Sequence, residues 1–311
     1  MIKLVKSFLD IPDKVKNKIF EMNIFFGENF SEYSNSIKVN VWYIYDEAYI
    51  ISINVYRKII FRYAMFETEP SCYDDSIEVS KIQFIQEVVK RLKNEGIEWV
   101  GTSATALFDC FPKNSFRIPF GSHVINLRFS EEEIWKNIHS KHRNSIKRAE
   151  KAGVIIKTEG DSLIDDYVKM DNITWKRSGR LGYGKQFFKN IVDGLKEEAV
   201  IAIAYKENVP QAGAVFFVNK QMAYYMYGTS IDHPEPGSAN FLHWEMIKLF
   251  KKIGVIRYSF VGCRINEDVE SKYHGIQRFK ERFGGELVQG YMWKVILNKN
   301  KYFFFRKLYK M

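Results

Sequence analysis

Cysteine and proline are scarce in this chain, which has 3 cysteines and 7 prolines among 311 residues. Cys72, Cys110 and Cys263 lie far apart and form no Cys-x-x-Cys pattern. This spacing argues against a disulfide framework and favours a reducing compartment. All three are expected to be ordinary buried or half-buried thiols. The few prolines, and the lack of a polar low-complexity run, argue against long disordered linkers.

Long apolar runs are also missing. No stretch approaches the length of a membrane span, and residues 1–9 are too short and too interrupted for the apolar core of a signal peptide. We therefore expect a cytoplasmic protein. Segment 302–310 mixes aromatic residues with cations. It could contact a membrane surface peripherally, although docking on the protein's own body is the simpler interpretation.

Positive charge is in excess, with 47 Lys and Arg against 37 Asp and Glu and a formal net charge of +10. An anionic partner is favoured, such as a nucleotide diphosphate, tRNA or an anionic membrane face. A lysine-rich soluble protein would have the same charge without such a partner. The aromatic content of 16% is high enough to line a cleft for an extended ligand.

An internal repeat organises the chain. Residues 84–96 and 242–254 both have the spacing of amphipathic helices, and both end in a glycine that leads into a strand. Three strand-like runs precede each helix, at 42–47, 48–57 and 59–66 and at 203–208, 211–218 and 222–229. The order strand, strand, strand, helix, strand therefore occurs twice. Repeats of this length indicate duplicated domains rather than a solenoid.

Between the two halves, residues 130–153 read as one basic helix. Ser130 and Glu133 form a capping box, acidic residues crowd the first turn and basic residues the last, and Gly153 ends the helix. The predicted domains are an N-terminal domain, 1–130, a linking basic helix, 131–153, and a C-terminal domain, 154–311.

The second half has a distinctive predicted order: strand 154–158, helices 161–178 and 185–197, strands 199–206, 211–218 and 222–229, helix 239–253, strand 255–262, helix 271–283 and strand 286–297. This is similar to the order of the GNAT fold of N-acyltransferases. That fold opens between its fourth and fifth strands, where acyl donors or peptide-like substrates bind. The predicted fold class is α/β (α+β), with two tandem GNAT-like domains, each a mixed central sheet flanked by helices.

Segment 273–286 is the most informative stretch of the chain. Its Phe279-Lys280-x-x-Phe283-Gly284-Gly285 core resembles the C-terminal signature of the FemAB-type aminoacyltransferases, which build peptidoglycan interpeptide bridges and are a tandem branch of the GNAT superfamily. Four further segments are similar to blocks of that family in content and spacing: 141–149, 174–180, 224–228 and 241–245. The resemblance covers nearly the whole chain in architecture and about residues 129–297 in motif.

The resemblance implies roles for five residues. Lys280 and Phe279 would flank the acyl-transfer centre, where a fixed ammonium can stabilise the oxyanion of a tetrahedral intermediate. Arg180 would hold the diphosphate of a nucleotide-sugar peptide, Tyr227 would line the peptide cleft between the domains, and Arg143 would bind substrate. Each also has a simpler interpretation: Lys280 as an exposed cation, Arg180 as a loop charge, Tyr227 as core packing and Arg143 as part of a solvated basic face. Arg143 and the other bases of its helix could also contact RNA phosphates.

Several other chemistries lack support. The loop that cradles the CoA pyrophosphate in ordinary GNAT proteins corresponds to 232–240, which has one glycine, two prolines and two acidic residues. This composition argues against tight pyrophosphate binding but does not exclude CoA. His139 and His142 share a helix face without a third ligand, so we expect no metal site. The chain has no Walker loop, no Gly-x-Ser-x-Gly elbow and no dinucleotide fingerprint.

Three functions remain open at this point. The first is aminoacyl transfer from aminoacyl-tRNA to an amine of a peptidoglycan precursor peptide. The second is N-acyl transfer from acyl-CoA or another carrier to an amino sugar or cell-surface precursor. The third is a catalytically silent tandem domain that binds a nucleotide sugar or RNA. No cofactor is expected beyond the acyl donor as co-substrate, and DNA is not expected as a partner. The first half has no motif as sharp, so chemistry is expected in the second half.

Overall fold

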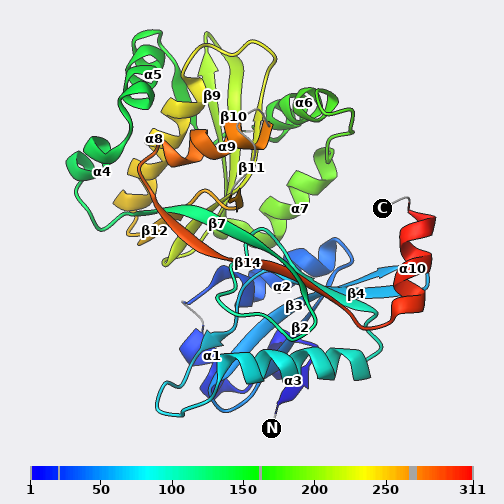
Figure 1. The fold of residues 1–311 in the computed structure, drawn as a ribbon. Helices are drawn as coiled ribbons and strands as arrows, with labels where there is room; N and C mark the ends of the chain where they lie inside the picture. Colours follow the sequence, from blue (N-terminus) through cyan, green and yellow to red (C-terminus); the bar gives the residue numbers. More distant parts are fainter. Residues whose placement is uncertain (1, 20–21, 161–162, 266–271, 310–311) are drawn as a thin grey trace. The chain divides into compact units, whose positions relative to one another are not determined.

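The structure, a computed structural model, describes residues 2–19, 22–160, 163–265 and 272–309. The chain forms two compact units, whose elements are drawn in Figure 1. Unit 1 comprises Met1–Ser122, Gly262–Ile265 and Gln289–Met311, and unit 2 comprises His123–Val261 and Asn266–Val288. Each unit has its own strands, helices and apolar core.

Unit 1 contains a mixed sheet with strand order β1-β2-β3-β4-β6-β14. Strands β2, β3 and β4 are antiparallel neighbours, whereas β4 and β6 run parallel. A short strand, β5, pairs with β3. The strands of this unit are β1 (Lys3–Val5), β2 (Asn40–Tyr45), β3 (Tyr49–Lys58), β4 (Phe61–Phe66), β5 (Ser71–Cys72), β6 (Trp99–Thr102), β13 (Cys263–Arg264) and parts of β7 (Phe116–Asn126) and β14 (Glu286–Ile296).

Helices cover both faces of the unit 1 sheet. Helix α3 (Lys81–Asn94) buries its apolar stripe in the same cluster as Val100 of β6. Trp99, the residue before Val100 in β6, packs instead against Phe305 of α10 (Lys299–Leu308). Since successive strand residues point to opposite faces, α3 and α10 cover opposite faces. The remaining helices of the unit are η1 (Phe8–Asp10), α1 (Asp13–Ile19), η2 (Ile24–Phe26) and α2 (Glu28–Ser36).

Unit 2 contains a second mixed sheet with strand order β7-β12-β11-β10-β9-β8. The strands β8, β9, β10 and β11 are antiparallel neighbours, and β11 runs parallel to β12. The strands that belong to this unit alone are β8 (Ile155–Lys157), β9 (Ala199–Lys206), β10 (Val209–Val218), β11 (Met222–Ser230) and β12 (Arg257–Ser259).

Alternate residues of β10 separate the two helical layers of unit 2. Ala214 and Phe216 lie in the core cluster that includes α8. A Cβ at Gly213 would come within 2.9 Å of the Tyr167 ring of α6, so a glycine here lets α6 pack closely on the opposite face. Figure 1 shows α6 and α7 on one side of these strands and α5 and α8 on the other. The helices are α4 (Glu131–Asn137), α5 (Ser140–Lys151), α6 (Leu163–Lys176), α7 (Lys185–Leu195), η3 (Lys196–Glu198), α8 (Ser238–Lys252) and α9 (Lys272–Glu281).

The predicted duplication is confirmed at the level of topology. In unit 1, three antiparallel strands, β2, β3 and β4, are followed by helix α3 and the parallel strand β6. In unit 2, strands β9, β10 and β11 are followed by helix α8 and the parallel strand β12. Both units are therefore GNAT-like, and the predicted fold class is correct.

Two features differ from the sequence-based expectation. The predicted single helix 131–153 is two helices, α4 and α5, separated where the backbone of Ile138 is extended and the side chain of Ile138 is buried. The segment 289–311, assigned from sequence to the domain 154–311, groups with unit 1. It does so because Trp293 and Val295 of β14 lie in the unit 1 core and Phe305 packs on Phe61 and Trp99.

Candidate active site

Strands β11 and β12 diverge in unit 2. They pair only at Met222–Tyr224 with Arg257–Ser259, although β11 continues to Ser230 along β10. A register shift opposite Val215 and Phe216 leaves Met226 as the extra residue of a β-bulge. Bulges re-aim side chains and are frequent beside active sites. This divergence matches the opening expected for a GNAT-like fold. Tyr225 and Tyr227 lie on the part of β11 that no longer pairs with β12.

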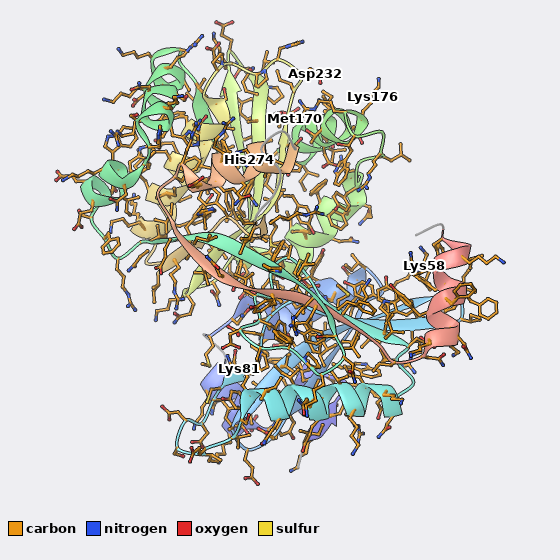
Figure 2. All side chains as sticks on the ribbon, in the orientation of Figure 1. Lys58, Lys81, Met170, Lys176, Asp232 and His274 are labelled. Carbon is orange, nitrogen blue, oxygen red and sulfur yellow. The ribbon has the colours of Figure 1, made fainter. Side chains whose placement is uncertain are left out.

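Lys280 lies at the end of β12. Its ammonium donates a hydrogen bond to the carbonyl of Val261, two residues beyond that strand. Val261 has a φ of 44°, which is uncommon for a β-branched residue, and its N–H donates to Ser259 Oγ at 3.2 Å. Such strained positions cluster at functional sites. Lys280 and Phe279 are half-buried on α9, the helix on which Figure 2 labels His274.

Phe279 packs between two buried histidines. The ring centroid of Phe279 lies 5.2 Å from that of His142 and 5.6 Å from that of His243. The carbonyl of Phe279 accepts a hydrogen bond from His142 Nε2 at 3.0 Å, which fixes a proton on that nitrogen. His243 Nδ1 shares a 2.5 Å hydrogen bond with the Tyr258 hydroxyl. The pair of histidines therefore holds the backbone and the ring of Phe279 in place.

Both histidines are neutral. Burial lowers the pKa of His142 to about 4, although its hydrogen bond to Phe279 opposes the shift. Burial, and to a smaller degree the positive charge of Lys280, lowers the pKa of His243 to about 3. If His142 or His243 were protonated, its charge would repel the Lys280 ammonium. With both histidines neutral, Lys280 is the one positively charged group among these three.

The Gly284-Gly285 pair has a packing reason. Gly284 has a φ of 75°, and a Cβ on it would come 2.3 Å from the carbonyl oxygen of Asn137 at the end of α4. A Cβ on Gly285 would lie 3.0 Å from the backbone of Val124 in β7. Glycine is the residue that tolerates both conditions. The pair lets the end of α9 sit directly against α4 and β7, which fixes the helix that carries Lys280.

Tyr227 and Arg180 belong to a second aromatic group. Tyr227 is half-buried, and its ring contacts those of Tyr183 and Phe187 at centroid distances of 5.4 and 5.5 Å. Arg180 is exposed after α6, with its guanidinium 5.9 Å from the Trp175 ring. Trp175 in turn contacts Tyr183 at 5.5 Å. The structure thus connects Arg180 to Tyr227 through Trp175 and Tyr183.

Arg143 has a different environment from the other four predicted residues. One of its guanidinium nitrogens donates to the carbonyls of Lys136, at 3.0 Å, and of Ile138. These carbonyls end α4, where intrahelical donors are lacking. Arg143 therefore joins α5 to the end of α4, one residue from His142. Its predicted part in substrate binding stays a prediction.

Three residues in and just after α6 were given no role from the sequence: Thr174 and Arg177 bond to β11, and Asp171 bonds to the segment before α7. Thr174 Oγ1 accepts from the N–H of Ser230 at 3.1 Å, and Arg177 donates to the carbonyl and hydroxyl of the same serine. Asp171 accepts from Trp175 Nε1 and from the Tyr183 N–H; burial raises its pKa, and these hydrogen bonds oppose the rise. The spacing of 171, 174 and 177 along one helix face was the available signal.

The loop that precedes α8 matches the predicted departure from a pyrophosphate-binding loop. Glu235 forms an ion pair with Lys206 at 2.7 Å, and its carbonyl accepts from both the N–H and the hydroxyl of Ser238 at the start of the helix. A Cβ on Gly237 would lie 2.1 Å from the carbonyl oxygen of Ser145. The helix start is therefore packed against α5, and the carboxylate close by is neutralised by Lys206.

One cavity in the described part of unit 2 is lined by none of the five predicted residues. That cavity, of about 260 Å³, is bounded by the Gly284-Gly285 turn, β7 and α4. Within the described residues, no group of three or more His, Cys, Asp or Glu side chains could hold a metal ion. Among those same residues, no helix has the length and apolarity to cross a membrane.

Comparisons with known proteins identify the family and the fold. The model of the FemAB family matches residues 70–207 and 204–310. The crystal structure of FemX has a TM-score of 0.72 to this chain, at 12% identity, and the match covers 97% of this chain and 99% of FemX. A comparison with curated protein sequences finds no match.

Two further solved structures are similar in fold. One is the C-terminal domain of a putative lysylphosphatidylglycerol synthetase from Agrobacterium fabrum, with a TM-score of 0.61 at 12% identity, over 93% of this chain and 92% of the other. The other is a tandem GNAT protein from the clavulanic acid biosynthesis pathway, with a TM-score of 0.54 at 8% identity, over 96% of this chain and 99% of the other. At these identities the matches establish the fold.

Proposed function

Because the chain belongs to the FemAB family of acyltransferases, which are linked to peptidoglycan, we propose that it transfers an aminoacyl group from aminoacyl-tRNA to an amine of a peptidoglycan precursor peptide. The amine nitrogen attacks the ester carbonyl carbon, and a tetrahedral oxyanion forms. The bond from this carbon to the ribose oxygen then breaks as the amide forms. One proton passes in net terms from the amine to the ribose oxygen. The reaction needs no oxidant and no metal.

The observation that carries this proposal is the position of Lys280. Its ammonium is held by the Val261 carbonyl just beyond β12, where β11 and β12 have diverged. The hydrogen bond to Val261 fixes the position of this positive charge beside the diverging strands. In a site with little water, such a fixed charge stabilises a developing oxyanion strongly. Lys280 is the proposed oxyanion stabiliser, and Phe279 positions it.

The acceptor would be held by the second aromatic group. Arg180 is exposed and flanked by the Trp175 ring, and its planar fork suits the diphosphate of a nucleotide-sugar peptide. Tyr227 lies beyond the bulge of β11, on the diverging part of the strand, and is the proposed contact for the peptide. Arg143 would act through α4 and α5, because its hydrogen bonds go to the end of α4.

The acyl donor distinguishes this proposal from N-acyl transfer by acyl-CoA. The close packing of Gly237 against the Ser145 carbonyl at the start of α8 disfavours a pyrophosphate at the usual CoA position. Charged tRNA fits the formal net charge of +10 and the expected cytoplasmic location. The catalytically silent alternative is set aside because the family consists of enzymes.

A transfer assay tests the proposal. The full chain is incubated with UDP-MurNAc-pentapeptide and tRNA charged with a labelled amino acid, and in parallel with labelled acetyl-CoA. We expect label in the peptide from charged tRNA and none from acetyl-CoA. Thermal stabilisation by acyl-CoA alone, together with acylation of an amine from acyl-CoA, would overturn the aminoacyl-tRNA proposal in favour of the second function.

A further inference from the structure

Helix α10 in unit 1 carries two apolar faces. The inner face consists of Tyr302, Phe305 and Tyr309, which pack in one cluster with Phe61 and Trp99. The Phe305 and Trp99 ring centroids are 4.4 Å apart. The spacing of three and four residues puts these side chains on one side of the helix. The inner face accounts for the docking of this segment on the protein's own body.

The outer face is exposed. The side chains of Phe303, Phe304 and Leu308 are 66%, 63% and 58% exposed. Phe304 and Leu308 lie four residues apart and so share one side of the helix. Single exposed apolar residues are ordinary, but three on ten residues of one helix form a patch that indicates an interaction site. Docking on unit 1 explains the inner face and leaves the outer face without a role.

A second apolar feature lies beside α10. Strands β3 and β4 are joined by a two-residue turn, Ile59-Ile60, and both isoleucines are 68% exposed. Lys58, which precedes the turn, lies with its ammonium 3.6 Å from the Tyr309 ring centroid. Figure 2 shows Lys58 next to α10. The tip of the hairpin and the end of α10 therefore form one continuous part of the unit 1 surface.

The backbone conformation of this turn costs free energy of folding when isoleucine occupies it. Ile59 has a φ of 57°, and a hairpin turn with a positive φ at its first central residue takes glycine there by preference. A β-branched residue in this conformation is a genuine outlier. Because both isoleucines are exposed, they add little packing energy that would offset the strain of the turn. Backbone strain of this kind is a sign of function.

An apolar cavity adjoins the same helix. It has a volume of about 650 Å³ and is lined by residues that include Phe116, Ile118, Trp293, Tyr302 and Arg306. Phe116 and Ile118 are themselves 69% and 51% exposed. The apolar surface thus continues from α10 into a concave region.

The sequence around α10 is rich in cations, although one of them, Lys301, forms an ion pair with the buried Glu98 at 2.8 Å. Residues 287–311 contain six Lys or Arg residues, and they contain no Asp or Glu. Arg57 and Lys58 add two cations beside the Ile59-Ile60 turn. A helix with bulky apolar side chains and cations on its exposed side is typical of segments that lie in the membrane interface. The charges complement the anionic lipids of such a surface.

We propose that the α10 surface, defined as Phe303, Phe304 and Leu308 with the Ile59-Ile60 turn and their flanking cations, binds an anionic phospholipid membrane. The apolar side chains enter the region between headgroups and acyl chains, and the lysine and arginine side chains contact lipid phosphates. The occupant is a lipid surface rather than a nucleic acid, because the exposed groups between the cations are aliphatic and phenylalanine side chains. This inference goes beyond the proposed reaction and does not depend on it.

Vesicle binding of the full chain tests the proposal without any substrate. The surface variant combines Ile59→Gly, Ile60→Asn, Phe304→Gln and Leu308→Gln; Gly-Asn suits the turn, and glutamine is a good helix former. Vesicles contain either phosphatidylcholine alone or phosphatidylcholine with phosphatidylglycerol. We expect wild-type protein to sediment with the phosphatidylglycerol vesicles and far less with the neutral ones. The surface variant should bind the anionic vesicles at least about tenfold more weakly.

A matched control removes exposed apolar residues elsewhere, through Leu9→Gln and Ile253→Gln, whose side chains are 70% and 61% exposed. This control should bind the anionic vesicles like the wild type, and thermal unfolding checks that all variants are folded. Equal binding by the surface variant and the wild type would overturn the proposal, as would failure of the wild type to bind anionic vesicles. A wild-type dimer that the surface variant abolishes, with vesicle binding unchanged, would assign the surface to a second copy instead.

Discussion

At the scale of single residues, the neutral state of His142 and His243 has a consequence for stability. Burial lowers the pKa of His142 to about 4 and that of His243 to about 3, below the value of about 6.5 expected in the unfolded chain. At a pH between the folded and the unfolded pKa values, the unfolded state binds protons that the folded state does not. The stabilisation is therefore complete above about pH 6.5 and is lost as the pH falls toward 4.

The substitution His142→Gln tests this pH dependence. Glutamine does not titrate, and its amide can still donate to the Phe279 carbonyl. We expect the urea midpoint of the wild type to fall clearly from pH 7 to pH 4.5, and that of the variant to fall less. An equal fall in both proteins would show that His142 does not contribute to the effect.

Gly284 sets a second expectation at the residue scale. Gly284→Ala places a Cβ near the Asn137 carbonyl at a φ of 75°, so we expect a loss of about 3 kcal/mol or more, the sum of strain and overpacking. Gly153→Ala is the control, because Gly153 has a φ of 76° and open space around it. The control should cost only about 1–2 kcal/mol. Urea unfolding of both variants gives the difference, and equal losses would argue against the contact with α4.

At the scale of elements, Arg143 connects α4 to α5. Its guanidinium donates to the carbonyls of Lys136 and Ile138, and hydrogen bonds to charged groups contribute about 1.5–3 kcal/mol. We expect Arg143→Met to lower the free energy of unfolding by about that amount. The salt dependence of tRNA binding should stay unchanged.

Arg148→Met serves as the control for Arg143, since Arg148 is an exposed cation on the same helix. Its substitution should leave stability nearly unchanged. If Arg143→Met instead leaves stability intact and weakens only the binding of substrate, the structural role of Arg143 is wrong and its predicted contact with substrate gains support.

Much of this architecture could be predicted from periodicity and glycine stops. The predicted strand 222–229 and helix 239–253 differ by at most one residue at each end from β11 and α8. The break of helix 131–153 could not be foreseen, because the basic pattern continues across it. It depends on the burial of Ile138 and on a backbone hydrogen bond from His139 to Arg282, far along the chain.

The site residues could be predicted only where they lie close together along the sequence. Lys280 and Phe279 lie in one motif, whereas His142 meets Phe279 across 137 residues of sequence. His243 is brought beside both by the packing of α8. The spacing of apolar residues along a sequence does not reveal which residues meet across such long separations. The anchoring of Lys280 by Val261 depends on a backbone conformation that valine adopts rarely, so its residue type gave no warning.

At the scale of the whole molecule, the formal net charge of +10 predicts a salt-sensitive interaction with charged tRNA. Each neutralised phosphate releases counterions on binding. With about five phosphate contacts, the affinity for tRNA should fall on the order of a hundredfold between 50 and 200 mM salt. Filter binding at several salt concentrations measures this slope. A flat response would exclude an electrostatic tRNA complex and would favour an uncharged or compact donor.

The most direct test of the proposed role of Lys280 is the single-turnover rate of aminoacyl transfer by Lys280→Met. Loss of one oxyanion-stabilising donor lowers this rate by roughly a hundred- to a thousandfold. We expect that decrease in Lys280→Met, a partial rate in Lys280→Arg, which keeps the charge in another geometry, and an unchanged rate in Lys252→Met, which removes an exposed lysine at the end of α8. A folded Lys280→Met protein that transfers the aminoacyl group at the wild-type rate would show that Lys280 does not stabilise the oxyanion.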